Sequence, residues 1–252
     1  MDDAAFILLN RKDLEEASRL IVTHFRRFGL TVHAGSRSKN CGPKTEAMYI
    51  RRPKQPSEPN KKADIIIDED SFFEFTTEFK YLGNIINETL DDTPDIKNRI
   101  KKASQAFGAM KQNIFQNLDI SIKLRMRFYN AIIVNLALWG CESWALKASD
   151  IKLFEVFHNR CLRAILRISR IHRVITTEIR KQCGDAYTME SVLEFRRCRW
   201  LHKIALMDNY RNPRRFLAAW YGIARLKERP QQTIRHGYKN TLKTLGYSND
   251  NL

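Results

Sequence analysis

The stretch TPDIKNRIKKASQAFGAMKQNIF (residues 93–115) marks the point at which the chain changes character. Thr93 suits the capping position of a helix, and Pro94 suits the first turn, where a missing backbone N–H costs nothing. The stretch predicts a helix from 94 to about 116, because apolar side chains recur in steps of three and four: Ile96, Ile100, Ala103, Phe107, Met110 and Ile114. Four lysines lie off this stripe and form a basic face: Lys97, Lys101, Lys102 and Lys111.

The chain after this stretch is almost wholly helical in its pattern. A second helix is predicted from Ser121 to about Trp139, and it becomes apolar on most faces after Tyr129. A helix that is apolar all round is buried, so we expect this one at the centre of a helical region. Three aromatic side chains are expected in its core: Phe128, Trp139 and Trp144.

Two later helices are predicted to combine an apolar face with a basic face. At about 100° per residue, the helix from about 149 to 170 turns one group inward: Ile151, Phe154, Phe157, Cys161, Ile165 and Ile168. An arginine stripe lies well away from that group: Arg160, Arg163, Arg167 and Arg170. The helix from about 188 to 208 is expected to bury Val192, Phe195, Trp200, Leu201 and Ile204 and to expose Arg196, Arg199 and Lys203.

The part of the chain before residue 93 mixes both kinds of element. The apolar run AAFILL (residues 4–9) predicts a buried strand, and the periodic residues 11–28 predict an amphipathic helix that Gly29 ends. Short β-branched or aromatic runs predict strands at 30–34, 44–50 and 63–67, and FEFTTEFKYLGNIIN (73–87) predicts two strands with a bend at Gly83. Two segments rich in turn residues predict loops: 35–43 and 51–62.

The charge of the chain is unevenly distributed. Of the 252 residues, 43% are hydrophobic, which suffices for a packed core, and the net charge is +16. Residues 1–95 hold 14 Lys and Arg against 17 Asp and Glu, a net charge of −3, so residues 96–252 hold +19. Such a basic region favours nucleic acid or an anionic membrane surface as the partner, and a solvated basic face without a partner remains the alternative.

The sequence gives no sign of a membrane segment or of a disulfide framework. The longest apolar run, AIIVNLALWG (131–140), is half of the roughly 20 residues that a membrane span needs. With no signal-peptide pattern either, we expect a soluble intracellular protein of the nucleus or cytoplasm. The five cysteines form no CxxC pair, and Cys198 with His202 has metal-ligand spacing but no second pair, so buried thiols are favoured over zinc.

The arginine faces suit phosphate. A guanidinium group stays charged and binds phosphate oxygens with two parallel hydrogen bonds, whereas interleaved aromatic side chains would indicate base stacking. Exposed aromatic residues are not evident in the pattern, so we expect contact with the nucleic-acid backbone and no reading of the base sequence.

Asp2 and Asp3 directly precede the apolar run at 4–9. They are either a solvated polar stretch or part of a metal-binding turn. Polymerase-type phosphoryl transfer uses two divalent ions held by carboxylates at a strand turn, and an Asp-Asp pair before an apolar strand has the right local shape.

Five segments in this order resemble the later palm and thumb of reverse transcriptases of non-LTR (LINE-like) retrotransposons: MDDAAFIL (1–8), FRRFGLTVH (25–33), KTEAMYI (44–50), FEFTTEFKYLGNIIN (73–87) and QAFGAMKQNIF (105–115). Three segments are similar to the C-terminal region of that family: NAIIVNLALWGCESWAL (130–146), HNRCLRAILRI (158–168) and RRCRWLHKIALM (196–207). The resemblance therefore covers most of the chain, and the shared order is more specific than any one segment.

The resemblance implies an α+β fold in three parts. Residues 1–92 would be a partial polymerase palm of short antiparallel strands and a helix, 93–145 a thumb-like helical subdomain, and 146–252 a basic helical C-terminal region. Asp2 and Asp3 would be catalytic ligands of Mg²⁺ from a Tyr-x-Asp-Asp turn, and Lys44 a catalytic lysine. A primer-gripping hairpin would contain Phe79, Tyr81, Leu82 and Gly83.

The resemblance also implies the partner, an RNA/DNA template-primer duplex. The first catalytic aspartate of the family, its fingers and the tyrosine before the Asp pair have no counterpart in the sequence, as in a C-terminal fragment that starts at the Tyr-x-Asp-Asp motif. Because preorganised charge dominates the catalysis of phosphoryl transfer, we expect no polymerase activity from this chain alone. The alternative is a non-catalytic, basic helical module that binds nucleic acid.

Overall fold

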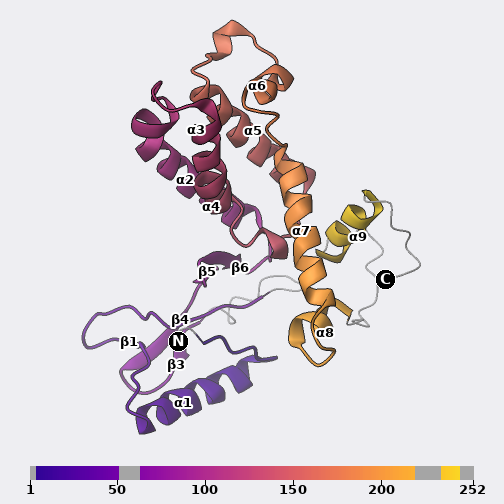
Figure 1. Cartoon of the computed structure of the whole chain (residues 1–252). Helices are drawn as coiled ribbons and strands as arrows, with labels where there is room; N and C mark the ends of the chain where they lie inside the picture. The colour runs from indigo at the N-terminus through magenta and orange to yellow at the C-terminus, as the bar shows by residue number, and fades with distance from the viewer. Residues whose placement is uncertain (1–3, 51–62, 219–233, 245–252) are drawn as a thin grey trace. The chain divides into compact units, whose positions relative to one another are not determined.

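The computed structural model describes residues 4–50, 63–218 and 234–244, which form two units (Figure 1). The first unit is Met1–Asp91 and the second is Asp92–Leu252. Helices and small sheets occur together, so the expected mixed α+β composition is confirmed. Each unit has its own hydrophobic core.

The predicted N-terminal helix is present as α1, Arg11–Arg27. Asn10 caps it, because its side-chain oxygen accepts a hydrogen bond of 2.8 Å from the backbone N–H of Asp13. Gly29 follows the helix with a φ of +74°, a left-handed conformation that glycine adopts without strain. The predicted end of this helix at Gly29 is therefore confirmed.

A small sheet centred on one strand forms the rest of the core of the first unit. Strand β4 (Ser71–Phe75) pairs antiparallel with β1 (Gly35–Ser36) and β3 (Ile65–Ile66) and parallel with β2 (Glu46–Ala47). A Cβ atom on Gly35 would lie 2.7 Å from the Phe72 ring, so this pairing needs glycine. Side chains from three of the strands are buried together: Ala47, Ile65 and Phe73.

The predicted strand at residues 4–9 is wrong. These residues belong to no strand, and the side chains of Ile7 and Leu9 are 94% and 97% exposed. A strand needs a neighbour for its backbone hydrogen bonds, and within the described ranges no strand pairs with this run. The other strands are shorter than predicted or shifted along the chain, and 30–34 is not a strand.

A separate hairpin ends the first unit. Strands β5 (Glu78–Tyr81) and β6 (Asn84–Asn87) pair antiparallel through a turn of two residues, Leu82 and Gly83, with φ of +47° and +87°. Positive φ at both positions is typical of the tightest hairpin turns. The bend at Gly83 is confirmed, but the segment 73–87 contributes to three strands, because its first residues belong to β4.

The second unit is helical among its described residues, and Figure 1 shows its helices from magenta to yellow. Two segments, Lys111–Phe115 and Tyr129–Val134, are π-helical, with one more residue per turn than an α-helix. The α-helices are α2 (Thr93–Met110), α3 (Ile122–Phe128), α4 (Asn135–Ala137), α5 (Ala148–Ile165), α6 (Thr176–Gln182), α7 (Met189–Ala205), α8 (Asn212–Ala218) and α9 (Ile234–Thr244).

One core joins most of these helices, from Ile96 to Leu193. It includes residues from both of the expected subdomains, 93–145 and 146–252, which therefore share their packing. At its centre the rings of Phe107 and Phe115 stack with centroids 4.5 Å apart, and Tyr129 meets both edge-on. The apolar stripes predicted for α2 and α5 face this core, except for Ile168, which lies beyond the end of α5 and outside the core.

Three aromatic side chains that were predicted to be buried are exposed: Phe128, Trp139 and Phe195. Trp144 is buried, as predicted. Trp139 is 60% exposed because α4 ends at Ala137, so helical periodicity does not extend to it. Phe128 is exposed on α3. Phe195 is 65% exposed because it follows the buried Leu193 by two residues, or about 200° around the helix.

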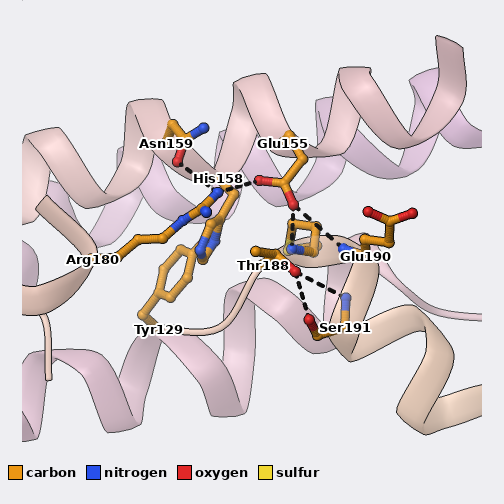
Figure 2. A network of polar contacts seen from close by, with 9 residues as sticks. Tyr129, Glu155, His158, Asn159, Arg180, Thr188, Glu190 and Ser191 are labelled. Carbon is orange, nitrogen blue, oxygen red and sulfur yellow. Dashed lines mark hydrogen bonds and ion pairs between the residues drawn. The ribbon is translucent and has the colours of Figure 1, made fainter. Parts of the chain in front are cut away.

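A network of polar contacts ties α5, α6 and α7 together, as Figure 2 shows. One oxygen of Glu155 on α5 accepts a hydrogen bond of 2.7 Å from Arg180 on α6. Its other oxygen accepts one of 2.6 Å from the backbone N–H of Met189 at the start of α7. A carboxylate at this end of a helix is favoured, because the free N–H groups there carry partial positive charge.

Candidate nucleic-acid interface

The arginine stripe predicted along one helix is divided between a helix and the segment that follows it. Helix α5 ends at Ile165, and Arg167 has a left-handed φ of +58°. Arg160 and Arg163 therefore lie on α5, whereas Arg167 and Arg170 lie beyond its end. The prediction of a single stripe along one helix is therefore wrong, because the helix ends before Arg167 and Arg170.

The turn nevertheless brings all four arginines to one concavity, which we call the basic pocket. Its volume is about 420 Å³. The wall consists of Lys111, Gln116, Arg160, Arg163, Ala164, Arg167, Ile168, Ser169 and Arg170. Five of these side chains are cationic and none is a carboxylate. Among the described residues, no acidic side chain forms an ion pair with the five.

The exposed cations of the basic pocket are not needed to hold the end of α5. Its last carbonyl groups accept hydrogen bonds from other donors, namely Arg125 to Ile165 (3.0 Å) and Gln116 to Ala164 (3.3 Å). The backbone N–H of Ile168 closes the helix on the carbonyl of Arg163, at 2.9 Å. These contacts satisfy the groups that a helix end leaves open. Sequence reasoning missed the buried Arg125, because nothing in the stretch IKLRMRF (122–128) distinguishes it from the neighbouring cations Lys123 and Arg127.

The five cations differ in how firmly they are held. Arg163 donates to the carbonyl of Val174 at 2.6 Å, while its Nη1 has no acceptor within the part of the chain that the structure describes. Arg160 donates to the hydroxyl of Ser104 at 3.2 Å. The other three are exposed and have no side-chain partner in the described ranges: Lys111, Arg167 and Arg170.

The remaining predicted contacts lie outside this pocket. Lys97 and Lys101 are exposed on α2, as expected. On α7, Arg199 and Lys203 are exposed, and the ammonium group of Lys203 lies 5.7 Å from the centre of the Trp200 ring. The prediction that Arg196 is exposed is wrong, because the residue is half-buried and its guanidinium group donates to Asn135 and to the carbonyl of Leu138.

Exposed aromatic side chains do occur, contrary to the sequence pattern. Trp139 and Phe195 are both exposed, and Phe195 precedes Arg199 by one helical turn. The sequence does contain a signal for Phe195, because it lies about 200° around the helix from Leu193. The prediction that Phe195 points inward did not take this angle into account.

Of the catalytic residues implied by the resemblance, only Lys44 lies within the described residues. Asp2 and Asp3 lie outside the described residues, and Lys44 is exposed before β2. In the ranges that the structure covers, no three His, Cys, Asp or Glu side chains gather to hold a metal ion. The Mg²⁺ ligands implied by the resemblance, Asp2 and Asp3, therefore stay predictions.

The cysteines are all free thiols, and burial controls their chemistry. Burial raises the pKa of Cys141 and of Cys161 to about 12 and that of Cys183 to about 11. These thiols stay protonated and unreactive at neutral pH. Cys41 is exposed, so the expectation of buried thiols does not hold for it.

The residues of the primer-gripping hairpin implied by the resemblance lie on β5 and its turn. Phe79 and Tyr81 share one face of β5, and their ring centroids are 6.5 Å apart. Leu82 is an exposed, bulky side chain in a left-handed conformation that costs roughly 1–2 kcal/mol. Such local strain is often retained at functional sites.

A comparison of the chain with protein-family models, with curated proteins and with solved structures finds no match. A separate survey of the helices in the described ranges finds none that is long and apolar enough to cross a membrane. The function is therefore argued from the geometry of the chain and from the motifs of its sequence.

Proposed function

We propose that the helical unit binds the phosphate backbone of nucleic acid in the basic pocket. The observation that carries this proposal is the composition of the wall, with five cations and no carboxylate around about 420 Å³. Like charges gathered without counter-charges repel one another, and phosphate groups relieve that repulsion. Arginine contributes four of the five cations, and its planar fork matches phosphate oxygens.

The experiment is a series of binding measurements with a fluorescent oligonucleotide at rising salt concentrations. The double variant Arg167→Gln/Arg170→Gln removes two exposed cations of the basic pocket. The matched control, Lys152→Gln/Lys181→Gln, removes the same charge from exposed lysines on α5 and α6 that do not line the pocket.

We expect the affinity of the unaltered chain to fall steeply with salt, because phosphate binding releases condensed counterions. The slope of log affinity against log salt should become smaller in magnitude by about 2 in the pocket variant, roughly 1 for each lost phosphate contact. The control should keep most of the slope. Equal losses in both variants, or binding that does not depend on salt, would refute the proposal.

We further propose that the chain is related to the non-LTR reverse transcriptases that its motifs resemble, and that the hairpin β5–β6 contacts the end of a primer in an RNA/DNA duplex. The formation of a tight hairpin at residues 78–87, with the strained Leu82 at its tip, supports this proposal. Primer extension with Mg²⁺ and nucleotides tests the accompanying expectation of no activity from this chain alone. Extension by the purified chain would contradict that expectation.

A further inference from the structure

A second concavity adjoins the basic pocket between α2 and α5, and we call it the apolar pocket. Its volume is about 200 Å³. Its wall consists of Ser104, Phe107, Gly108, Lys111, Phe157, Arg160, Cys161 and Ala164. Lys111, Arg160 and Ala164 line both pockets. The two spaces therefore share a wall, so a ligand could occupy both at once.

The floor of the apolar pocket is buried, and its rim is open. Phe107, Phe157 and Cys161 belong to the buried core. At the rim, a Cβ atom built on Gly108 would meet no atom within 4 Å. The pocket thus combines an apolar, partly aromatic base with free space above the one glycine of α2.

Arg160 joins the two spaces physically. Its guanidinium group lies 5.9 Å from the centre of the Phe157 ring and donates to the hydroxyl of Ser104. A guanidinium group held in this way presents a flat cationic surface on which an aromatic ring can stack, while its charge still attracts phosphate. Proteins that bind single strands combine these two features, a cationic groove and flat surfaces for the bases.

We propose that the apolar pocket receives one unpaired base of the strand whose phosphates lie in the basic pocket. This inference rests on the proposed binding of nucleic acid. The pocket is smaller than the range of about 300–1,000 Å³ of pockets for drug-sized ligands and suits a single flat ring system. A paired base is buried within a duplex and cannot enter it. The site therefore favours single-stranded or overhanging nucleic acid over a blunt duplex.

The test compares two fluorescent oligonucleotides of equal length and charge, oligo-dT and a strand of abasic sites with the same backbone. Gly108→Leu fills the apolar pocket without removing a cation, because a helical leucine side chain lies back over the preceding turn, which contains Ser104. Gly108→Ala is the matched control, since it adds a single methyl group in open space. Both substitutions raise helix propensity, and circular dichroism checks that the variants fold.

The unaltered chain and Gly108→Ala should bind oligo-dT at least about fivefold more tightly than the abasic strand, the lower end for one stacked base. In Gly108→Leu the two strands should bind equally, at the affinity of the abasic strand. Equal binding of both strands by the unaltered chain overturns the base pocket but leaves the phosphate site intact. A preference that persists in Gly108→Leu also overturns it. Failure to bind either strand overturns the proposed function itself.

Discussion

Tyr129 and His158 form a buried polar pair within an otherwise apolar core. The hydroxyl of Tyr129 and Nδ1 of His158 are 2.9 Å apart. Burial raises the pKa of Tyr129 well above its ordinary value, so the hydroxyl stays protonated at neutral pH. Burial lowers the pKa of His158 to about 4, so the imidazole is neutral at pH 7, and its tautomer decides which of the two groups donates.

Removing the Tyr129 hydroxyl should destabilise the helical unit. In Tyr129→Phe the ring is kept, but Nδ1 of His158 loses its hydrogen-bond partner in a buried position. A buried polar atom without a partner costs about 1–3 kcal/mol. Urea denaturation of the variant and of the unaltered chain measures the difference, and Tyr81→Phe on the separate hairpin is the control. Equal midpoints for Tyr129→Phe and the unaltered chain would contradict the assigned bond.

The lowered pKa of His158 predicts a loss of stability in acid. The unfolded chain takes up this proton near the ordinary pKa of 6.5, whereas the folded chain resists until about pH 4. The free energy of unfolding should thus fall as the pH drops through this window, by about 2 kcal/mol between pH 7 and pH 5. Urea denaturation at both pH values should show a smaller fall in His158→Gln. The same fall in the variant would assign the effect to other groups.

At the scale of the helices, the side chain of Glu155 on α5 connects α5 with α6 and α7. Its carboxylate binds Arg180 on α6 and the first backbone N–H group of α7 (Figure 2). Glu155→Ala should therefore destabilise more than Arg180→Ala, because only the first also removes the acceptor of the Met189 N–H at the start of α7. We expect a loss of about 1–3 kcal/mol. A double-mutant cycle on unfolding free energies isolates the pair, and two independent, additive losses would argue against the contact.

The hairpin turn predicts a gain in stability from a local change. Asparagine tolerates the left-handed conformation far better than leucine, and Asn-Gly is the favoured pair for such turns. Leu82→Asn should stabilise the hairpin by about 0.5–1 kcal/mol. Amide hydrogen exchange of β5 and β6 measures the change. Unchanged or weaker protection of these amides would mean that Leu82 is not strained.

The longer helices could be predicted from the sequence, whereas the strands could be predicted only in part. Helices carry their signals locally, as Asn10, Ser121 and the apolar stripe of α2 illustrate, whereas a strand exists only through pairing with a partner. The run 4–9 has strong strand propensity and no partner among the described strands. The basic pocket was predictable as a set of arginines but not as a shape, because its form depends on the left-handed turn at Arg167.

On the scale of the whole molecule, the chain consists of two separately packed units, of which the second carries the excess positive charge. The apolar core of residues 96–193 shares no residue with the small core around Ala47, Ile65 and Phe73. The excess positive charge lies in residues 96–252. The candidate binding site and the larger core therefore belong to the same unit.

This separation predicts that residues 92–252 fold and bind without the first unit. The shortened chain should unfold in one cooperative transition in urea and bind an oligonucleotide with the same salt dependence as the full chain. Circular dichroism and anisotropy measure the two properties, with the full chain as the reference. A non-cooperative transition would show that the larger core depends on residues 1–91.

The π-helical segment Lys111–Phe115 begins at the border of the two pockets. The N–H of Gln116 bonds to the carbonyl of Lys111, five residues back, so this turn holds one residue more than an α-helical turn. Lys111 begins this wide turn and lines both pockets. The irregular end of the helix therefore helps to set where one of the five cations lies.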